Sequence, residues 1–166
     1  MMRAAVLHGP NLNRLGKRRP DKYGHATLAD IERDIDDTAA RIGVAVQHFQ
    51  SNHEGSLIDW LHERQDALDL IVVNPAGLTP YGYSLLDALN DTGLPFAVVH
   101  ISPFAAVDGR TREDIFAASA TVYASGMGWR GYAHALEALT AKVTRTPAPG
   151  SDGLRERPQA LDDTLT

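Results

Sequence analysis

Two residues of one long loop have side chains that together could remove a proton from carbon. Arg18 and Tyr23 lie within residues 10–26, a stretch of 17 residues without hydrophobic periodicity that directly follows a predicted strand. A guanidinium beside a phenol favours the phenolate and lowers the tyrosine pKa from about 10. Such a tyrosinate could abstract a proton next to a carbonyl, and His100 could then protonate a leaving hydroxyl. The stretch is equally compatible with a solvated charged loop.

Polar side chains also follow the predicted strands, at the points where the strands end. Asn11 comes just after the first strand, and Asn74 ends the third. His100 and Ser102 lie at the end of the fourth. An asparagine after a strand is more often a turn residue, but ligands of open parallel sheets bind at the carboxyl ends of the strands. The four residues together therefore predict a shared pocket.

Five short apolar runs are expected to position these residues. They are rich in Val, Ile and Ala without polar alternation, which is typical of strands buried on both faces. Amphipathic helical patterns separate the runs. The predicted strands span residues 4–8, 44–49, 70–74, 96–101 and 120–125. This alternation predicts an α/β fold, a flavodoxin-like, doubly wound five-stranded parallel sheet with three layers, α/β/α.

Three local signals predict helix starts. Thr27 with Asp30, and Ser51 with Glu54, have the spacing of capping boxes. The Thr-Pro pair at residues 79–80 has the pattern of an N-cap followed by the first helical residue.

Composition excludes several functional classes. The 166 residues carry a net charge of −5, which argues against a general nucleic-acid surface, and the chain has no cysteine for disulfides, thiolate chemistry or zinc. No apolar run approaches the roughly 18 residues of a membrane span, and the N-terminus lacks a signal-peptide layout. We therefore expect a cytoplasmic protein without membrane or nucleic-acid partners. Residues 1–145 are predicted to form its single domain, and the polar residues 146–166 a disordered tail.

No motif predicts a metal or a cofactor. His8, His48 and His62 fall on strand or helix patterns and are interpreted as structural residues. No group of His, Asp and Glu residues has the sequence spacing of a metal site. The glycine pattern at residues 126–131 follows the last strand rather than the first, which favours a tight turn over a nucleotide site.

Several segments, in order, resemble the motifs of the type II 3-dehydroquinate dehydratases. They are Gly-Pro-Asn-Leu-Asn-Arg-Leu-Gly at 9–16, Tyr-Gly at 23–24, Gln-Ser-Asn-His-Glu-Gly at 50–55, Asn-Pro at 74–75 and His-Ile-Ser at 100–102. The resemblance spans residues 4–143. It implies a flavodoxin-like fold, a homododecamer built from trimers, no cofactor, and a lyase of the shikimate pathway. The implied reaction is trans elimination of water from a cyclic hydroxy-keto acid through an enolate.

The resemblance also implies roles for individual catalytic residues. Tyr23 corresponds to the base, and Arg18 to the arginine that activates it. His100 corresponds to the general acid. Asn11 matches a residue that holds a water beside the enolate, where a fixed donor stabilises developing charge.

The implied substrate is a small carboxylic acid. Asn74 and the backbone at Ile101 and Ser102 match the cradle for its carboxylate. Asp87 matches a residue contributed across the trimer interface.

Some positions depart from the family pattern. Val98 stands where the family usually has Glu, so His100 is expected to lack its carboxylate partner. Pro80 replaces a substrate-binding His, and Leu86 replaces an Arg. The usual arginine-containing segment is altered at 107–111, with Thr111 at one former arginine position, although Arg110 or Arg112 could substitute after a local shift.

These departures leave three functions open. The first is an ordinary 3-dehydroquinate dehydratase in which Arg112 and water compensate for the lost groups. The second is a diverged lyase or isomerase acting on a less hydroxylated carboxylic acid in secondary metabolism, because a site without its hydroxyl partners disfavours a hydroxylated substrate. The third is a non-catalytic oligomer that binds small acids, against which the intact Tyr23 and His100 argue.

Overall fold

Strands and helices alternate along the chain in the computed structural model, which describes residues 1–17 and 24–145. The strands are β1 (Met2–His8), β2 (Val44–Gln50), β3 (Leu70–Asn74), β4 (Phe96–His100) and β5 (Val122–Ser125). The helices are α2 (Leu28–Ile42), α3 (Glu54–Arg64), α4 (Tyr83–Asp91), α5 (Phe104–Val107) and α6 (Gly131–Arg145). Short 3-10 turns occupy η1 (Leu12–Arg14), η2 (Gln65–Ala67) and η3 (Ala76–Leu78). Each predicted strand is present, with ends that differ by at most two residues.

The strands of the described part of the chain form one parallel sheet in the order β2-β1-β3-β4-β5. This is the flavodoxin-like strand order, in which the chain reverses its direction of travel across the sheet between β1 and β3. His8 lies opposite both Gln50 and Asn74, while His100 lies opposite Ser125. The predicted polar strand ends therefore meet at one edge of the sheet.

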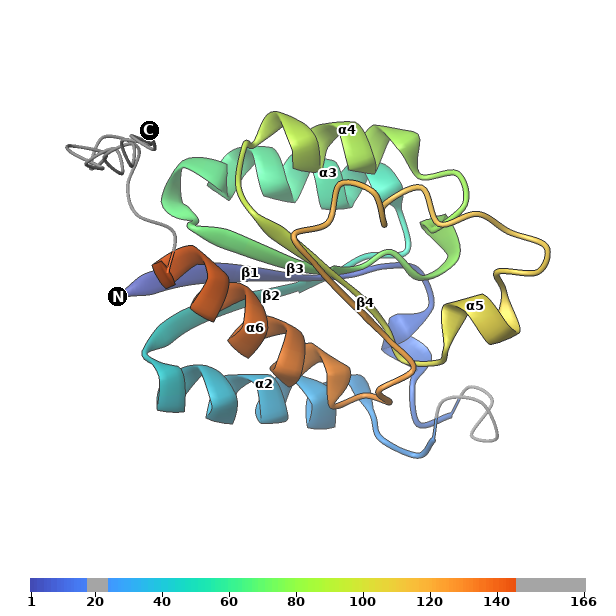
Figure 1. The fold of residues 1–166 in the computed structure, drawn as a ribbon, viewed down its shortest axis with the longest axis horizontal. Helices are drawn as coiled ribbons and strands as arrows, with labels where there is room; N and C mark the ends of the chain where they lie inside the picture. Colours follow the sequence, from blue (N-terminus) through green and yellow to red (C-terminus); the bar gives the residue numbers. More distant parts are fainter. Residues whose placement is uncertain (18–23, 146–166) are drawn as a thin grey trace, which may run out of the picture.

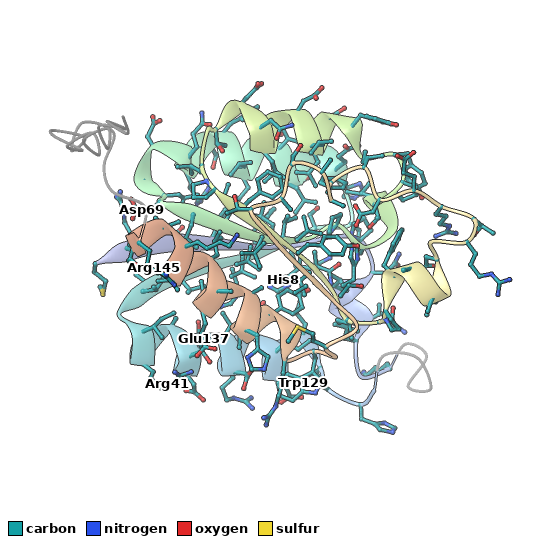
Figure 2. The ribbon with its side chains drawn as sticks, in the orientation of Figure 1. His8, Arg41, Asp69, Trp129, Glu137 and Arg145 are labelled. Carbon is teal, nitrogen blue, oxygen red and sulfur yellow. The ribbon has the colours of Figure 1, made fainter. Side chains whose placement is uncertain are left out.

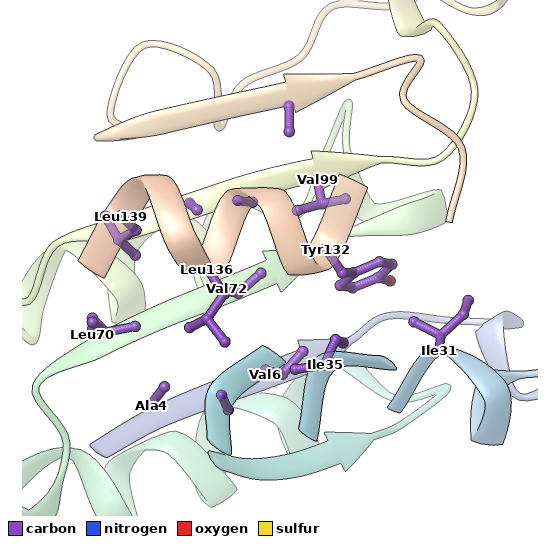
Figure 3. Packing of buried hydrophobic residues seen from close by; sticks show 14 of the residues in the cluster. Ala4, Val6, Ile31, Ile35, Leu70, Val72, Val99, Tyr132, Leu136 and Leu139 are labelled. Carbon is purple, nitrogen blue, oxygen red and sulfur yellow. The ribbon is translucent and has the colours of Figure 1, made fainter. Parts of the chain in front are cut away.

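Two helical layers cover the sheet, with α2 and α6 on one face and α3 and α4 on the other (Figure 1). Successive strand residues alternate between the two cores, so that Val6 packs toward α2 and α6 and Leu7 toward α3 and α4. Figure 3 shows the first core, in which α6 contributes Tyr132, Leu136 and Leu139. The predicted three-layer α/β fold is confirmed.

An ion pair joins the two helices of the first layer on their outer side. The Arg41 guanidinium of α2 donates to the Glu137 carboxylate of α6 at 2.6 Å (Figure 2). This hydrogen bond is the main reason that the pKa of Glu137 lies below its usual range. Because Arg41 is largely exposed and Glu137 is only partly buried, solvent screens the pair, which contributes little to stability.

The helix-start predictions had mixed outcomes. The Thr27–Asp30 capping box is confirmed, since the Thr27 hydroxyl accepts from the Asp30 amide and the Asp30 carboxylate accepts from the Thr27 amide. The Ser51–Glu54 box is wrong, because α3 has His53 as its N-cap. Glu54 instead accepts a hydrogen bond from the Leu85 amide in the first turn of α4, at 3.0 Å. It therefore caps the neighbouring helix.

The predicted helix start at residues 79–80 is also wrong. Thr79 ends η3, where its hydroxyl donates to the Ala76 carbonyl at 2.7 Å, and α4 begins only at Tyr83. A 3-10 turn satisfies this hydroxyl locally, so it does not cap the following helix.

Membrane insertion finds no support in the described helices, since none is both long enough and apolar enough to span a bilayer. The predicted tail at 146–166, and the predicted catalytic residues Arg18 and Tyr23, lie outside the described residues.

Candidate active site

A cavity of about 340 Å³ opens at the carboxyl ends of β3 and β4. Its walls come from η1, from the turn after β3, and from the segment that connects β4 to β5. The predicted site residues on these walls are Asn74, His100, Ile101, Ser102 and Arg112. Of the four strand-end residues predicted to share a pocket, Asn74, His100 and Ser102 line this cavity, at the edge of the sheet that the topology favours.

A close approach between the ends of β1 and β3 shapes the first wall. The Gly9 amide donates to the Asn74 carbonyl at 2.9 Å. A Cβ at Gly9 would lie 2.5 Å from the Pro75 carbonyl oxygen, so only glycine fits there. Asn11 follows in a left-handed conformation with φ 68°, and its backbone N–H donates to the side-chain oxygen of Asn52. Asn11 is exposed and is not among the described residues that line the cavity.

Asn74 is a buried polar group of the cavity whose side chain is fixed by hydrogen bonds. Its side chain is buried, and its carbonyl oxygen accepts from the Ala76 amide at 3.0 Å. The same side chain hydrogen-bonds the hydroxyl of Tyr132, which is fully buried. Burial raises the pKa of Tyr132 by more than the hydrogen bond from Asn74 lowers it, and this phenol therefore stays neutral. The Asn74 amide is thus held in one orientation before any ligand arrives.

His100 has a carboxylate partner, contrary to the prediction drawn from Val98. The His100 Nε2 and Asp114 Oδ2 atoms lie 2.7 Å apart, with both side chains at least nine-tenths buried. Val98 instead points into the core under α3 and α4, where it is fully buried. Asp114 comes from the connection between β4 and β5, fourteen residues after His100, so no motif around the histidine could reveal it.

Asp114 is itself firmly held as a carboxylate. Its Oδ2 accepts a second hydrogen bond from the Tyr123 hydroxyl at 2.9 Å, and its Oδ1 accepts from the Phe116 amide at 3.0 Å. Burial opposes ionisation, but the hydrogen bonds and the charge of His100 outweigh it and hold the pKa of Asp114 below its usual range. Burial and the neighbouring carboxylate also raise the pKa of Tyr123. An ionised aspartate that accepts from His100 fixes the ring orientation and stabilises an imidazolium.

The segment after β4 forms the opposite wall. The carbonyls of His100 and Ile101 accept from the amides of Gly126 and Gly128, which holds this turn against the one before α6. Arg112 reaches the cavity, whereas Arg110 is not among the described residues that line it. Of the two arginines considered as substitutes, Arg112 is the one placed to act.

Two other altered positions, Pro80 and Leu86, lie in different environments. Pro80 lines the cavity, as does its neighbour Thr79. Leu86 instead packs against the core between the sheet and the α3–α4 layer. Asp87 is exposed on α4 and is not part of the cavity wall in the described single chain.

A model of the family described as dehydroquinase class II matches residues 2–140. The chain belongs to this family. It is 43% identical over 139 residues to a 3-dehydroquinate dehydratase of Halothermothrix orenii, covering 84% of this chain and 94% of that protein. It is 42% identical over 160 residues to one of Roseiflexus castenholzii, covering 96% and 98%.

Solved structures of class II dehydroquinases have the same fold. The type II dehydroquinase from Butyrivibrio crossotus superposes with a TM-score of 0.80 at 31% identity, over 84% of this chain and 97% of that one. The enzyme from Propionibacterium acnes gives 0.77 at 32% identity, over 87% and 97%. In this class II dehydroquinase, the cavity is lined by a fixed amide, an arginine and a histidine that a buried aspartate holds. Such a set can bind an anion and exchange one proton with it.

Proposed function

We propose that this class II dehydroquinase removes water from 3-dehydroquinate. The observation that carries the proposal is His100, which lines the cavity together with Asn74 and is held by the buried Asp114 carboxylate. A histidine held by a carboxylate can donate a proton to a leaving hydroxyl at neutral pH. The names of the relatives and the family membership support the same substrate.

The proposed reaction divides proton removal and proton delivery between two residues. Tyr23, activated by Arg18, takes the proton from the carbon next to the carbonyl, and the C–H electron pair forms an enolate. Collapse of the enolate forms the carbon–carbon double bond and expels the hydroxyl, which takes a proton from His100 and leaves as water. Asp114 stabilises the His100 imidazolium before this transfer. Asn11 would hold a water that donates to the enolate oxygen.

Substrate binding would use the carboxylate and the ring hydroxyls at different walls. Asn74 and the backbone of Ile101 and Ser102 would hold the carboxylate at the strand ends. Arg112 would reach the ring hydroxyls, in place of the arginines that the altered segment lacks. Its position on the cavity wall supports this compensation.

We also propose that the chain works in the cytoplasm as a homododecamer assembled from trimers. Asp87 is exposed on α4 and separate from the cavity of its own chain, as expected for a residue that reaches a neighbour's site. Light scattering coupled to size-exclusion chromatography tests the assembly. A monomeric mass with full activity would contradict it.

A second candidate function is supported by Pro80. This residue lines the cavity where the family pattern has a histidine, and its side chain has no group that can hydrogen-bond a substrate hydroxyl. A lyase or isomerase acting on a less hydroxylated carboxylic acid would tolerate this change.

An absorbance assay separates the two functions. Purified protein is mixed with 3-dehydroquinate, and the conjugated enone product is followed in the ultraviolet. Turnover of about 1 per second or more, which is ordinary for enzymes, supports the first function, whereas no product at millimolar substrate contradicts it. Under the proposed mechanism, Tyr23→Phe abolishes turnover, and unchanged activity in this variant would refute a tyrosinate base. Binding of a small carboxylate without conversion would instead support a non-catalytic role.

A further inference from the structure

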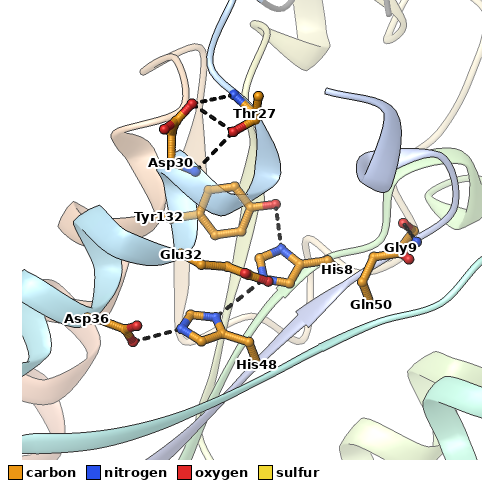
Figure 4. Close-up of polar contacts among 9 residues, drawn as sticks. All are labelled: His8, Gly9, Thr27, Asp30, Glu32, Asp36, His48, Gln50 and Tyr132. Carbon is orange, nitrogen blue, oxygen red and sulfur yellow. Dashed lines mark hydrogen bonds and ion pairs between the residues drawn. The ribbon is translucent and has the colours of Figure 1, made fainter. Parts of the chain in front are cut away.

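Two histidines and a glutamate lie together between β1, β2 and α2, outside the cavity (Figure 4). His8 Nε2 lies 3.5 Å from His48 Nδ1 and 3.8 Å from the Glu32 carboxylate. One ligand atom from each residue falls within 4.8 Å of the other two. His8 is fully buried, whereas the His48 and Glu32 side chains are 16% and 32% exposed. Solvent therefore reaches the cluster from the Glu32 side.

The sheet register explains how distant residues meet here. His48 pairs with Val6, so His8 lies two residues further along the adjacent strand, on the same face. Helix α2 crosses this face and places Glu32 over both rings. Because the three positions are separated by sixteen residues or more in sequence, they have no motif spacing, and the sequence alone predicts only structural roles for the histidines.

The ring geometry suits a tetrahedral metal ion. Zinc–nitrogen bonds are about 2.0–2.1 Å long, which places two histidine nitrogens on one tetrahedral zinc about 3.4 Å apart. The observed separation of 3.5 Å is close to this value.

Each histidine also has a polar partner at the ring nitrogen that faces away from the cluster. His48 Nε2 donates to the Asp36 carboxylate at 2.9 Å, which leaves the lone pair of His48 on Nδ1, facing the cluster. His8 Nδ1 lies 3.4 Å from the Tyr132 hydroxyl. When a metal takes Nε2 of His8, the ring can carry its proton on Nδ1 and donate it to the Tyr132 oxygen. Metal-binding histidines in proteins are oriented by outer partners of this kind.

We propose that His8, His48 and Glu32 form a binding site for a divalent transition metal of the zinc class, with Asp36 and Tyr132 as outer partners. Two imidazoles and one carboxylate leave the fourth tetrahedral position for water. This donor set favours zinc over magnesium or calcium, which prefer oxygen ligands. Tyr132 also hydrogen-bonds Asn74, so this one side chain links the proposed metal site to a residue that lines the cavity.

Calorimetry on the full chain, without an affinity tag and stripped of metal with a chelator, tests the site. The wild type is expected to bind one zinc per chain, and binding of zinc no tighter than magnesium would contradict the proposal. His48→Gln and Glu32→Gln, both at partly exposed residues, should each weaken zinc binding at least tenfold. Asp36→Asn should weaken it about 10- to 100-fold, as is usual for outer partners. Asp37→Asn, at an exposed neighbour on the same helix, should leave it unchanged.

Cobalt provides a second readout that does not depend on enzymatic activity. Co²⁺ in a four-coordinate site with nitrogen and oxygen ligands absorbs visible light strongly, and His48→Gln should lose this band whereas His62→Gln on α3 retains it. Zinc should raise the Tm of the wild type but not of His48→Gln. Wild-type zinc affinity in both His48→Gln and Glu32→Gln would overturn the assignment. Loss of dehydratase activity would not bear on it.

Discussion

Replacing Asp114 by asparagine removes the charge that holds His100 while preserving size and shape. The Nε2–Oδ2 distance of 2.7 Å and the burial of both groups make this a charge-assisted hydrogen bond shielded from water. Hydrogen bonds to charged groups contribute about 1.5–3 kcal/mol. If this energy keeps His100 protonated until it transfers its proton, Asp114→Asn lowers the rate about 10- to 150-fold.

The loss is expected in kcat rather than KM. Asp114 is not among the described residues that line the cavity, so it acts as a positioning residue through His100. Steady-state measurements of dehydration, with the Tm of each variant as a check on folding, separate the two parameters. Glu113→Gln, at the exposed neighbouring carboxylate, serves as the control and should match the wild type.

Tyr123→Phe provides an intermediate case. It removes the other hydrogen bond to Asp114 Oδ2 but leaves the His100 pair in place, so its effect should be smaller than that of Asp114→Asn. A folded Asp114→Asn protein with kcat within about twofold of wild type would refute the argument that His100 depends on this carboxylate.

Three further measurements concern Arg112, the pH dependence of the Asp114 contribution, and the Glu54 contact. Arg112→Ala should raise KM about 2- to 10-fold, which corresponds to the loss of one hydrogen bond. Arg110→Ala should leave KM unchanged. Equal effects of the two variants in steady-state assays would argue against a pocket role for Arg112. Because the folded-state pKa of Asp114 is depressed, its ionisation stabilises the fold above about pH 4 and less at lower pH. The difference in unfolding free energy between wild type and Asp114→Asn should therefore shrink in urea titrations from neutral to acidic pH, and a constant difference would contradict this. Glu54→Ala should lower the free energy of unfolding by about 1 kcal/mol in urea, since the Leu85 amide loses its cap; no change would show that water replaces the carboxylate.

The sheet and the cavity were predictable because they depend on local patterns. Apolar runs without alternation located the strands, and parallel topology then brings Asn74 and His100 to one edge. The Thr27–Asp30 box was predictable for the same reason, since both partners lie within one turn.

Contacts between distant segments could not be predicted in this way. Glu54 has the local spacing of a capping residue, yet its carboxylate reaches Leu85 on another helix. Asp114 and the cluster of His8, His48 and Glu32 likewise depend on register and loop path rather than on spacing. Side chains on different elements find their partners only once the layers have packed.

The position of Asp114 has a consequence for recombining this chain with its relatives. The histidine and its carboxylate belong to separate segments that can be exchanged independently, one in strand β4 and the other in the β4–β5 connection. A chimera that received this connection from a relative without an acidic residue at position 114 would keep Val98 and lose Asp114, and so would lack the carboxylate that holds His100. Exchange of the strand and the connection as one block would preserve the pair. Crossover points in this protein should therefore lie before residue 96 or after residue 123.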